Sequence, residues 1–231
     1  EINRILTDHA ADLLLAPTEV GAAHLADEGL AERTVVVGDV MTDILFSVRD
    51  SVIDTPSPVM TELDLPEGGY SLATIHRAEN TDDPERLRSI LESLAAVDHP
   101  VVLLAHPRLV AKCDEHGITL GDSGNLRMHP PLAYPELVAS TLHARGVVTD
   151  SGGLQKEAFL LRAPCTTVRP QTEWVETVDL GWNVLVEPGQ ALVDAASRAR
   201  PTEPADADAH PYGDGNAAAR VVQALTEHLP G

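Results

Sequence analysis

Residues 146–157 read Gly-Val-Val-Thr-Asp-Ser-Gly-Gly-Leu-Gln-Lys-Glu, and this stretch indicates how the chain folds. Its apolar start predicts a short buried strand, and the residues after the glycine pair predict a helix. The first N–H groups of a helix have no partner inside the helix, and the helix dipole adds partial positive charge there. Because Gly152 and Gly153 let an anion approach the backbone closely, this turn is typical of a phosphate site.

The same stretch places an acid within reach of the turn. Glu157 follows Ser151 by six positions, which is about 9 Å along a helix. A carboxylate there could hold ribose hydroxyls while the turn holds a diphosphate. The alternative is a glycine-rich turn in which Ser151 only caps the helix. On this stretch alone the two interpretations stand level.

Composition narrows the class of protein. The 231 residues are 43% apolar, enough for one large domain or two small ones. No apolar run approaches the roughly 20 residues that span a bilayer, and no signal peptide pattern occurs, so no membrane partner is expected. The net charge of -20 argues against a nucleic-acid partner, since phosphates need a basic surface. The acidic surface fits either a high-salt habitat or GC-rich codons.

Cysteine use points to the compartment. Cys113 and Cys165 are the only cysteines in the sequence, and two do not make a disulfide framework. A reducing, cytoplasmic setting is therefore expected. Cys165 lies in an apolar stretch and is interpreted as a small buried hydrophobic residue.

From residue 70 onward, short apolar runs alternate with helical patterns. In the clearest helix, residues 84–97, Asp83 is placed as the N-cap and Pro84 as the first residue. Such alternation predicts an α/β fold, a Rossmann-like, doubly wound parallel sheet with helices on both faces. The predicted strands are residues 70–75, 101–105, 126–128, 146–149, 165–168 and 183–186.

The first 38 residues have a different organisation. Residues 1–10 and 18–28 are predicted helices, and residues 12–16 and 34–37 are predicted strands. Two strands do not hold a stable sheet of their own. The chain also starts without Met, inside a predicted helix. Residues 1–38 are therefore expected to be the tail of a domain whose start is absent.

Composition assigns the remaining segments. Residues 54–58 contain two prolines and predict a stiff, exposed connector. Residues 200–211 predict a loop, and its Asp206, Asp208 and His210 are interpreted as solvated, since no closed ligand set for a metal accompanies them. Further helices are predicted over residues 41–53 and 216–228.

Polar side chains follow five of the predicted strands. Ligands of open parallel sheets bind at the carboxyl ends of strands, so this recurrence favours a nucleotide site over a plain turn. His76 is the best candidate for chemistry, since an imidazole can donate to a diphosphate or move a proton; its alternative is a cap or a packed edge histidine. His106 is expected only to buttress the site, and Trp174 is interpreted as core. The polar segments are residues 76–80, 106–108, 129–131, 150–153 and 169–173.

Several familiar motifs do not occur in the sequence. There is no G-x-G-x-x-G after a strand and no G-x-x-x-x-G-K-[ST], so neither NAD binding nor ATP hydrolysis is implied. Zinc spacings and the G-x-S-x-G elbow are also missing, and Ser151 has no obvious triad.

Taken together, these segments resemble the non-hydrolysing UDP-N-acetylglucosamine 2-epimerases. Each match is weak alone, but all occur in the order of the family over nearly the whole chain. The resemblance implies the glycosyltransferase-B architecture, two Rossmann-like domains with a cleft between them. The matching segments are residues 1–4, 16–19, 38–43, 76–80, 131–134, 149–157, 169–174 and 211–215.

The resemblance also implies domains and an activity. Residues 1–38 would end the N-terminal domain, residues 39–210 would form the UDP-binding domain, and residues 211–231 would be a helix that crosses back. Family members interconvert UDP-GlcNAc and UDP-ManNAc by eliminating UDP and adding it back, without a metal or redox cofactor. A cytoplasmic homodimer in cell-surface polysaccharide biosynthesis is expected of the full-length protein.

Roles for single residues follow from the same resemblance. His76 would contact the diphosphate and assist catalysis, and Arg4, the second catalytic candidate, would line the cleft from the first domain. Glu157 would bind the ribose. The phosphates would lie on Ser151, Gly152 and Gly153, and the uracil between Leu132 and Leu137.

Two departures from the family pattern limit these expectations. The acid–base carboxylates of the family come mostly from upstream of Glu1, so residues 1–231 alone are expected to bind UDP weakly and epimerise little. Trp174 stands where some members carry Arg. The rival interpretations are a UDP-sugar glycosyltransferase of the same fold and a non-catalytic nucleotide-sugar-binding subunit. The early match at Asn3 and Arg4 together with His76 favours the epimerase.

Overall fold

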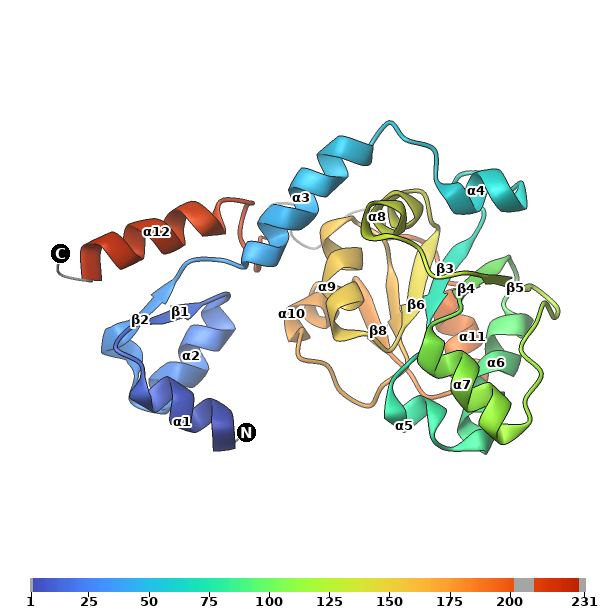
Figure 1. Ribbon diagram of the computed structural model, residues 1–231, viewed down its shortest axis with the longest axis horizontal. Coiled ribbons are helices and arrows are strands. Elements are labelled where there is room, and N and C mark those ends of the chain that lie inside the picture. The colour runs from blue at the N-terminus through green and yellow to red at the C-terminus, as the bar shows by residue number, and fades with distance from the viewer. Residues whose placement is uncertain (1, 202–209, 229–231) are drawn as a thin grey trace. The chain divides into compact units, whose positions relative to one another are not determined.

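The structure is a computed structural model that describes residues 2–201 and 210–228. These residues fall into two compact units, which are described separately (Figure 1). One contains residues 2–50 and 210–228, and the other contains residues 51–201. The predicted loop over residues 200–211, with Asp206 and Asp208, lies mostly outside the described residues. Among the described residues, no helix is both long and apolar enough to cross a membrane.

The second unit is built on a parallel sheet. Its described residues form six strands in the order β5-β4-β3-β6-β7-β8, all parallel. The chain thus starts in the middle, fills one side, then returns to β6 and fills the other. This confirms the predicted doubly wound α/β sheet. The strands are β3 (Ser71–Thr74), β4 (Val101–Leu104), β5 (Leu126–His129), β6 (Gly146–Thr149), β7 (Cys165–Thr167) and β8 (Asn183–Leu185).

Helices cover both faces of this sheet, because successive strand residues point to opposite sides. In β3, Leu72 packs in one apolar cluster with Val59, whereas Ala73 packs in another with Leu87 and Ile90. Figure 1 shows the helices on either side of the strands. They are α4 (Pro58–Leu63), α5 (Ala78–Thr81), α6 (Pro84–Ala96), α7 (Pro107–His116), α8 (Tyr134–Leu142), α9 (Gly152–Leu160), α10 (Val175–Asp179) and α11 (Gln190–Ala196).

Two local expectations are confirmed here. Asp83 caps α6, and its side chain accepts hydrogen bonds from the N–H groups of Glu85 and Arg86. Cys165 is buried, and burial raises the pKa of its thiol to about 12. The thiol is therefore a packing group at neutral pH.

The predicted exposed connector over residues 54–58 is wrong at its end. Ser57 is fully buried and is the N-cap of α4. Its hydroxyl donates to Ser140 Oγ at 2.9 Å and lies 3.2 Å from the Tyr70 hydroxyl. Tyr70 in turn donates to the Ser140 carbonyl at 2.6 Å. Three hydroxyl groups from distant segments satisfy one another here, a pairing that proline content does not reveal.

The first unit combines the two ends of the chain. The loop before α3 meets the loop before α12, since Asp39 N donates to Tyr212 O at 3.1 Å. Asp43 accepts the N–H groups of Ala217 and Ala218 at 3.0 and 2.8 Å and so caps α12. The elements are α1 (Ile2–Ala10), β1 (Leu14–Ala16), α2 (Glu19–Asp27), a 3-10 turn (Ala31–Arg33), β2 (Thr34–Val36), which is parallel to β1, α3 (Val40–Val52) and α12 (Ala217–His228).

The two compact units divide after residue 50, in the last turn of α3. The assignment of residues 1–38 to a preceding domain and of residues 39–210 to a UDP-binding domain stays a prediction.

Candidate functional site

A pocket of about 330 Å³ opens at the carboxyl ends of β3, β4 and β6. The sheet order reverses between β3 and β6, which is where open α/β sheets bind ligands. Its lining residues are Thr74, His76, Leu104, His106, Pro131, Leu132, Tyr134, Leu137, Ser151, Gly153, Leu154 and Glu157.

A larger cavity of about 420 Å³ lies elsewhere, between α6 and residues 118–126. Of its lining residues, Arg88 and Glu92 alone carry charge. It adjoins the amino end of β5, away from the strand ends that carry the polar residues. We therefore place the candidate site in the smaller pocket.

Most of the predicted site residues lie together. Gly152 starts α9 beside the pocket without lining it, and Arg4 belongs to the first unit. In α1, Arg4 pairs with Asp8 at 2.6 Å and with Glu28. Those that line the pocket are His76, Leu132, Leu137, Ser151, Gly153 and Glu157. Their individual roles stay predictions.

The start of α9 offers backbone donors to the pocket. Ser151 occupies the N-cap position, but its side chain makes no capping hydrogen bond. Its own N–H donates to Thr149 Oγ1 at 2.9 Å. Within the described part of the chain, no hydrogen bond from the N–H of Gly152 or Gly153 is formed. A Cβ at Gly153 would meet nothing within 4 Å. Space and donors for an anion thus coincide at this turn.

Glu157 supplies an acceptor further along the pocket. The Tyr134 hydroxyl donates to its Oε1 at 3.0 Å. Burial raises the pKa of the Glu157 carboxyl, while the Tyr134 hydrogen bond and the charge of Lys156 act in the opposite direction. A desolvated carboxylate with a fixed orientation is suited to accept hydrogen bonds from a diol.

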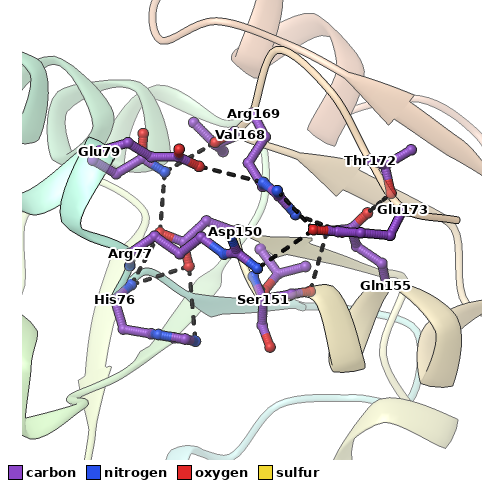
Figure 2. Close-up of polar contacts among 12 residues, drawn as sticks. His76, Arg77, Glu79, Asp150, Ser151, Gln155, Val168, Arg169, Thr172 and Glu173 are labelled. Atoms are coloured by element: carbon purple, nitrogen blue, oxygen red, sulfur yellow. Dashed lines mark hydrogen bonds and ion pairs between the residues drawn. The ribbon is translucent and has the colours of Figure 1, made fainter. Parts of the chain in front are cut away.

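His76 follows β3 and lies between a carboxylate and a second imidazole. Its Nε2 is 3.9 Å from Asp150 Oδ1 (Figure 2). Its ring stacks on that of His106, with centroids 4.7 Å apart and planes inclined by 27°. Desolvation lowers the pKa of His106, and electrostatic interactions with His76 and Arg108 lower it further, while the interaction with Asp150 opposes them. His106 therefore contributes a neutral ring to the pocket wall.

A network of charged groups behind His76 joins the ends of two strands, β3 and β7. Arg169, after β7, is 5% exposed and forms two hydrogen bonds with Glu173 at 2.8 and 3.0 Å. Its Nε lies 3.3 Å from Glu79 Oε1 in α5, and Arg77 Nη2 lies 3.8 Å from Glu173 (Figure 2). These contacts raise the pKa of Arg169 and lower that of Glu173. The network holds the loops that follow β3 and β7 together.

Sequence reasoning missed several groups. The sequence pattern places Asp150 only within a strand-end stretch, yet Asp150 is fully buried behind His76. Tyr134 follows Leu132 in a matching segment, and the pattern predicts no role for it. His106 does more than buttress, since its ring lines the pocket. Trp174 is half-buried and not core, and its Nε1 donates to Gly152 O at 2.7 Å.

Two of the polar side chains that follow strands, those of His129 and Arg108, do not line the pocket. His129 turns from the pocket, and its ring bonds Pro130 O at 2.7 Å and lies 3.2 Å from Glu62 of α4. Arg108 reaches Thr81 and Asp82. In the described residues no group of three or more His, Cys, Asp or Glu could hold a metal ion.

Comparisons with known proteins agree with this geometry. Residues 1–226 match the family described as UDP-N-acetylglucosamine 2-epimerase. A UDP-N-acetylglucosamine 2-epimerase homolog from Methanococcus maripaludis is 35% identical over 228 residues, which are 97% of this chain and 63% of that protein. The UDP-2,3-diacetamido-2,3-dideoxy-D-glucuronate 2-epimerase of Pseudomonas aeruginosa is 40% identical over 98% of this chain and 63% of its own length.

A solved structure is similar throughout. The crystal structure of Methanocaldococcus jannaschii UDP-GlcNAc 2-epimerase in complex with UDP-GlcNAc and UDP superposes with a TM-score of 0.82 at 32% identity. The match covers 98% of this chain and 64% of that one. The chain thus spans just under two thirds of the length of these relatives.

Proposed function

The chain belongs to the UDP-N-acetylglucosamine 2-epimerase family, and from this premise we propose that it takes part in the interconversion of UDP-GlcNAc and UDP-ManNAc. The observation that carries the proposal is the pairing of open backbone donors at α9 with the Glu157 carboxylate in one pocket beside His76. That arrangement suits a nucleoside diphosphate, with phosphates at the turn and ribose at the acid.

Each part of the nucleotide has a proposed partner. The diphosphate lies on Ser151, Gly152 and Gly153, at the positive end of α9. The ribose hydroxyls donate to Glu157, whose position Tyr134 fixes. Leu132 and Leu137, both partly buried at the pocket wall, flank the uracil.

The chemistry asks the site to stabilise a departing anion. In the elimination, the proton on C2 of the sugar is removed and the C1–O bond to UDP breaks, which leaves 2-acetamidoglucal. Re-addition of UDP to C1 with protonation of C2 on the opposite face completes the epimerisation. Preorganised donors such as the α9 amides and His76 are worth several kcal/mol where such charge develops. Arg4, which belongs to the first unit, remains a second proposed catalytic residue.

C2 proton exchange tests this proposal. UDP-GlcNAc is incubated in deuterated water with residues 1–231, and separately with these residues fused to the N-terminal segment of the 35%-identical relative. We expect UDP-ManNAc and deuterium at C2, slowly with the first protein and faster with the fusion, since the resemblance puts the acid–base carboxylates upstream. Binding of UDP without exchange by either protein would overturn the epimerase in favour of a binding subunit.

The 40%-identical relative raises a second substrate. It is named a UDP-2,3-diacetamido-2,3-dideoxy-D-glucuronate 2-epimerase, and the bond changes at C1 and C2 would be the same. The nucleotide pocket does not separate the two sugars, because they share UDP. Offering both in one competition assay gives the ratio of their kcat/KM values, which decides the sugar.

The same proposal covers the setting of the enzyme. We propose a cytoplasmic homodimer that uses no metal or redox cofactor. Sedimentation measures the assembly, and turnover that survives treatment with a chelator checks the cofactor.

A further inference from the structure

We propose that Asp150 is a positioning residue for His76, holding the segment of residues 76–80 against the end of β6 with one carboxylate oxygen facing the imidazole. This inference rests on the proposed function for the role of His76. It assigns to Asp150 a task beyond the anion turn in whose sequence it lies.

The first observation is the set of donors around Asp150. The carboxylate accepts from His76 N at 3.0 and 3.1 Å, from Arg77 N at 2.9 Å and from Asn80 Nδ2 at 3.0 Å (Figure 2). Asn80 also donates to Val168 O at 2.9 Å. Hydrogen bonds to a carboxylate from positioned N–H groups are among the stronger ones in proteins. They tie the whole loop after β3 to the strand that carries the anion turn.

The second observation is the burial of Asp150 beside the imidazole. Asp150 has no exposed surface, and a buried polar side chain needs hydrogen-bond partners inside the protein. The nearby guanidinium groups of Arg77 and Arg169 are taken up by Glu173 and Glu79. Among the described residues, the ring of His76 faces the Asp150 carboxylate, with Nε2 3.9 Å from Oδ1.

The third observation is the opposite face of His76. The stacked His106 ring accepts a hydrogen bond on Nδ1 from Arg108 N at 3.1 Å, which fixes its position at the start of α7. The His76 ring thus lies between a fixed neutral ring and a fixed carboxylate. A one-ångström displacement of a reacting group can cost about 100-fold in rate, so loosening this loop should act on the chemical step.

The test separates positioning from mere folding. In Asp150→Asn, an amide NH₂ takes the place of one oxygen and meets the N–H groups that the carboxylate held. We expect faster hydrogen exchange at the amides of His76 and Arg77. We also expect kcat for C2 exchange to fall on the order of 100-fold, while KM and the Kd for UDP change less than about threefold.

Asp43→Asn is the matched control, because Asp43 also accepts two backbone N–H groups, at α12. Asp43→Asn should speed amide hydrogen exchange at Ala217 and Ala218 and leave amide exchange at His76 and Arg77 unchanged. If Asp150→Asn does not fold, Asn80→Ser removes one donor to the carboxylate. It should lower kcat to a smaller degree and likewise change KM and the Kd for UDP little.

Unchanged exchange at His76 and Arg77 in Asp150→Asn would overturn the inference, as would equal losses in kcat and UDP affinity. Failure of the proposed function looks different. In that case the wild type shows no C2 exchange, while amide protection of residues 76 and 77 still depends on Asp150.

Discussion

The Tyr134 hydroxyl donates to Glu157 Oε1 over 3.0 Å, and this bond joins the first residue of α8 to the middle of α9 along the pocket wall. The two residues are 23 positions apart. Burial and the adjacent Glu157 charge raise the pKa of Tyr134, so the phenol remains a donor at any physiological pH. Among the described residues, only Oε1 of this carboxylate accepts a hydrogen bond, and its second oxygen can therefore take a ligand. The pair therefore sets where a ribose can be held.

Tyr134→Phe should weaken UDP binding about fivefold, because one hydrogen bond that orients the carboxylate is worth about 1 kcal/mol. Titration calorimetry with UDP at pH 7.5 measures this. Glu157→Gln, which alters the acceptor itself, should cost more than Tyr134→Phe. An unchanged Kd in Tyr134→Phe would remove Tyr134 from the site.

Glu157 should also make UDP affinity depend on pH. Its pKa is raised by burial above the ordinary 4.5, so the carboxylate is protonated while the pH is still above the usual range. A protonated acid accepts poorly from ribose, and affinity should fall as pH falls through this raised pKa.

The contribution of Glu157 to the free energy of unfolding changes with pH in the opposite direction to its effect on UDP affinity. The folded protein binds this proton more readily than the unfolded chain, so falling pH adds stability from this group. Titration calorimetry from pH 7 to pH 5 measures the Kd for UDP in the wild type and in Glu157→Gln. The titration of UDP itself is the same in both experiments and cancels in the comparison. An identical change of UDP affinity with pH in both proteins would refute a role for the Glu157 carboxyl in binding.

Gly153→Ala separates the needs of the ligand from those of the fold. A Cβ at this position meets no atom within 4 Å, and alanine in a helix is favoured over glycine by about 0.5–1 kcal/mol. We expect an equal or higher unfolding free energy together with at least a tenfold loss of UDP affinity, since the methyl group occupies the approach to the amides.

Gly121→Ala is the matched control, because its Cβ also meets open space and it lies outside the candidate site. It should leave UDP binding unchanged. Full UDP affinity in Gly153→Ala would show that no phosphate approaches this turn.

The sequence predicts the sheet well because its signals are local. Each strand of the second unit is a short apolar run, and the predicted boundaries of β6 agree with the structure while the others differ by one or two residues. The α6 cap at Asp83 is equally local. The turn at residues 150–153 could be placed at the sheet edge for the same reason.

Contacts between distant segments could not be predicted in this way. Ser57 is in a proline-rich stretch, and only the fold brings it to Tyr70 and Ser140. Asp150 accepts hydrogen bonds from residues 70 to 74 positions away. Strand ends identify which segments converge, but hydrogen-bond partners depend on loop conformations that the sequence pattern does not specify.

Tyr70→Phe should show how much the buried hydroxyl cluster contributes to the free energy of unfolding. Tyr70 is fully buried, and its hydroxyl contacts Ser57 and Ser140. Removing it leaves buried partners unsatisfied, so we expect the unfolding free energy to fall by about 1–3 kcal/mol at pH 8. Urea denaturation followed by circular dichroism measures this loss.

The stability difference between the wild type and Tyr70→Phe should depend on pH in the alkaline range. Burial raises the pKa of Tyr70 from 10 to about 12, so between these values the folded protein keeps a proton that the unfolded chain has lost. Wild-type stability should therefore fall as pH rises from 10 to 12, and Tyr70→Phe lacks this term. The stability gap between the two proteins should narrow over this range, other groups cancelling in the difference. A gap of constant size would mean that the Tyr70 hydroxyl is not buried in the folded protein.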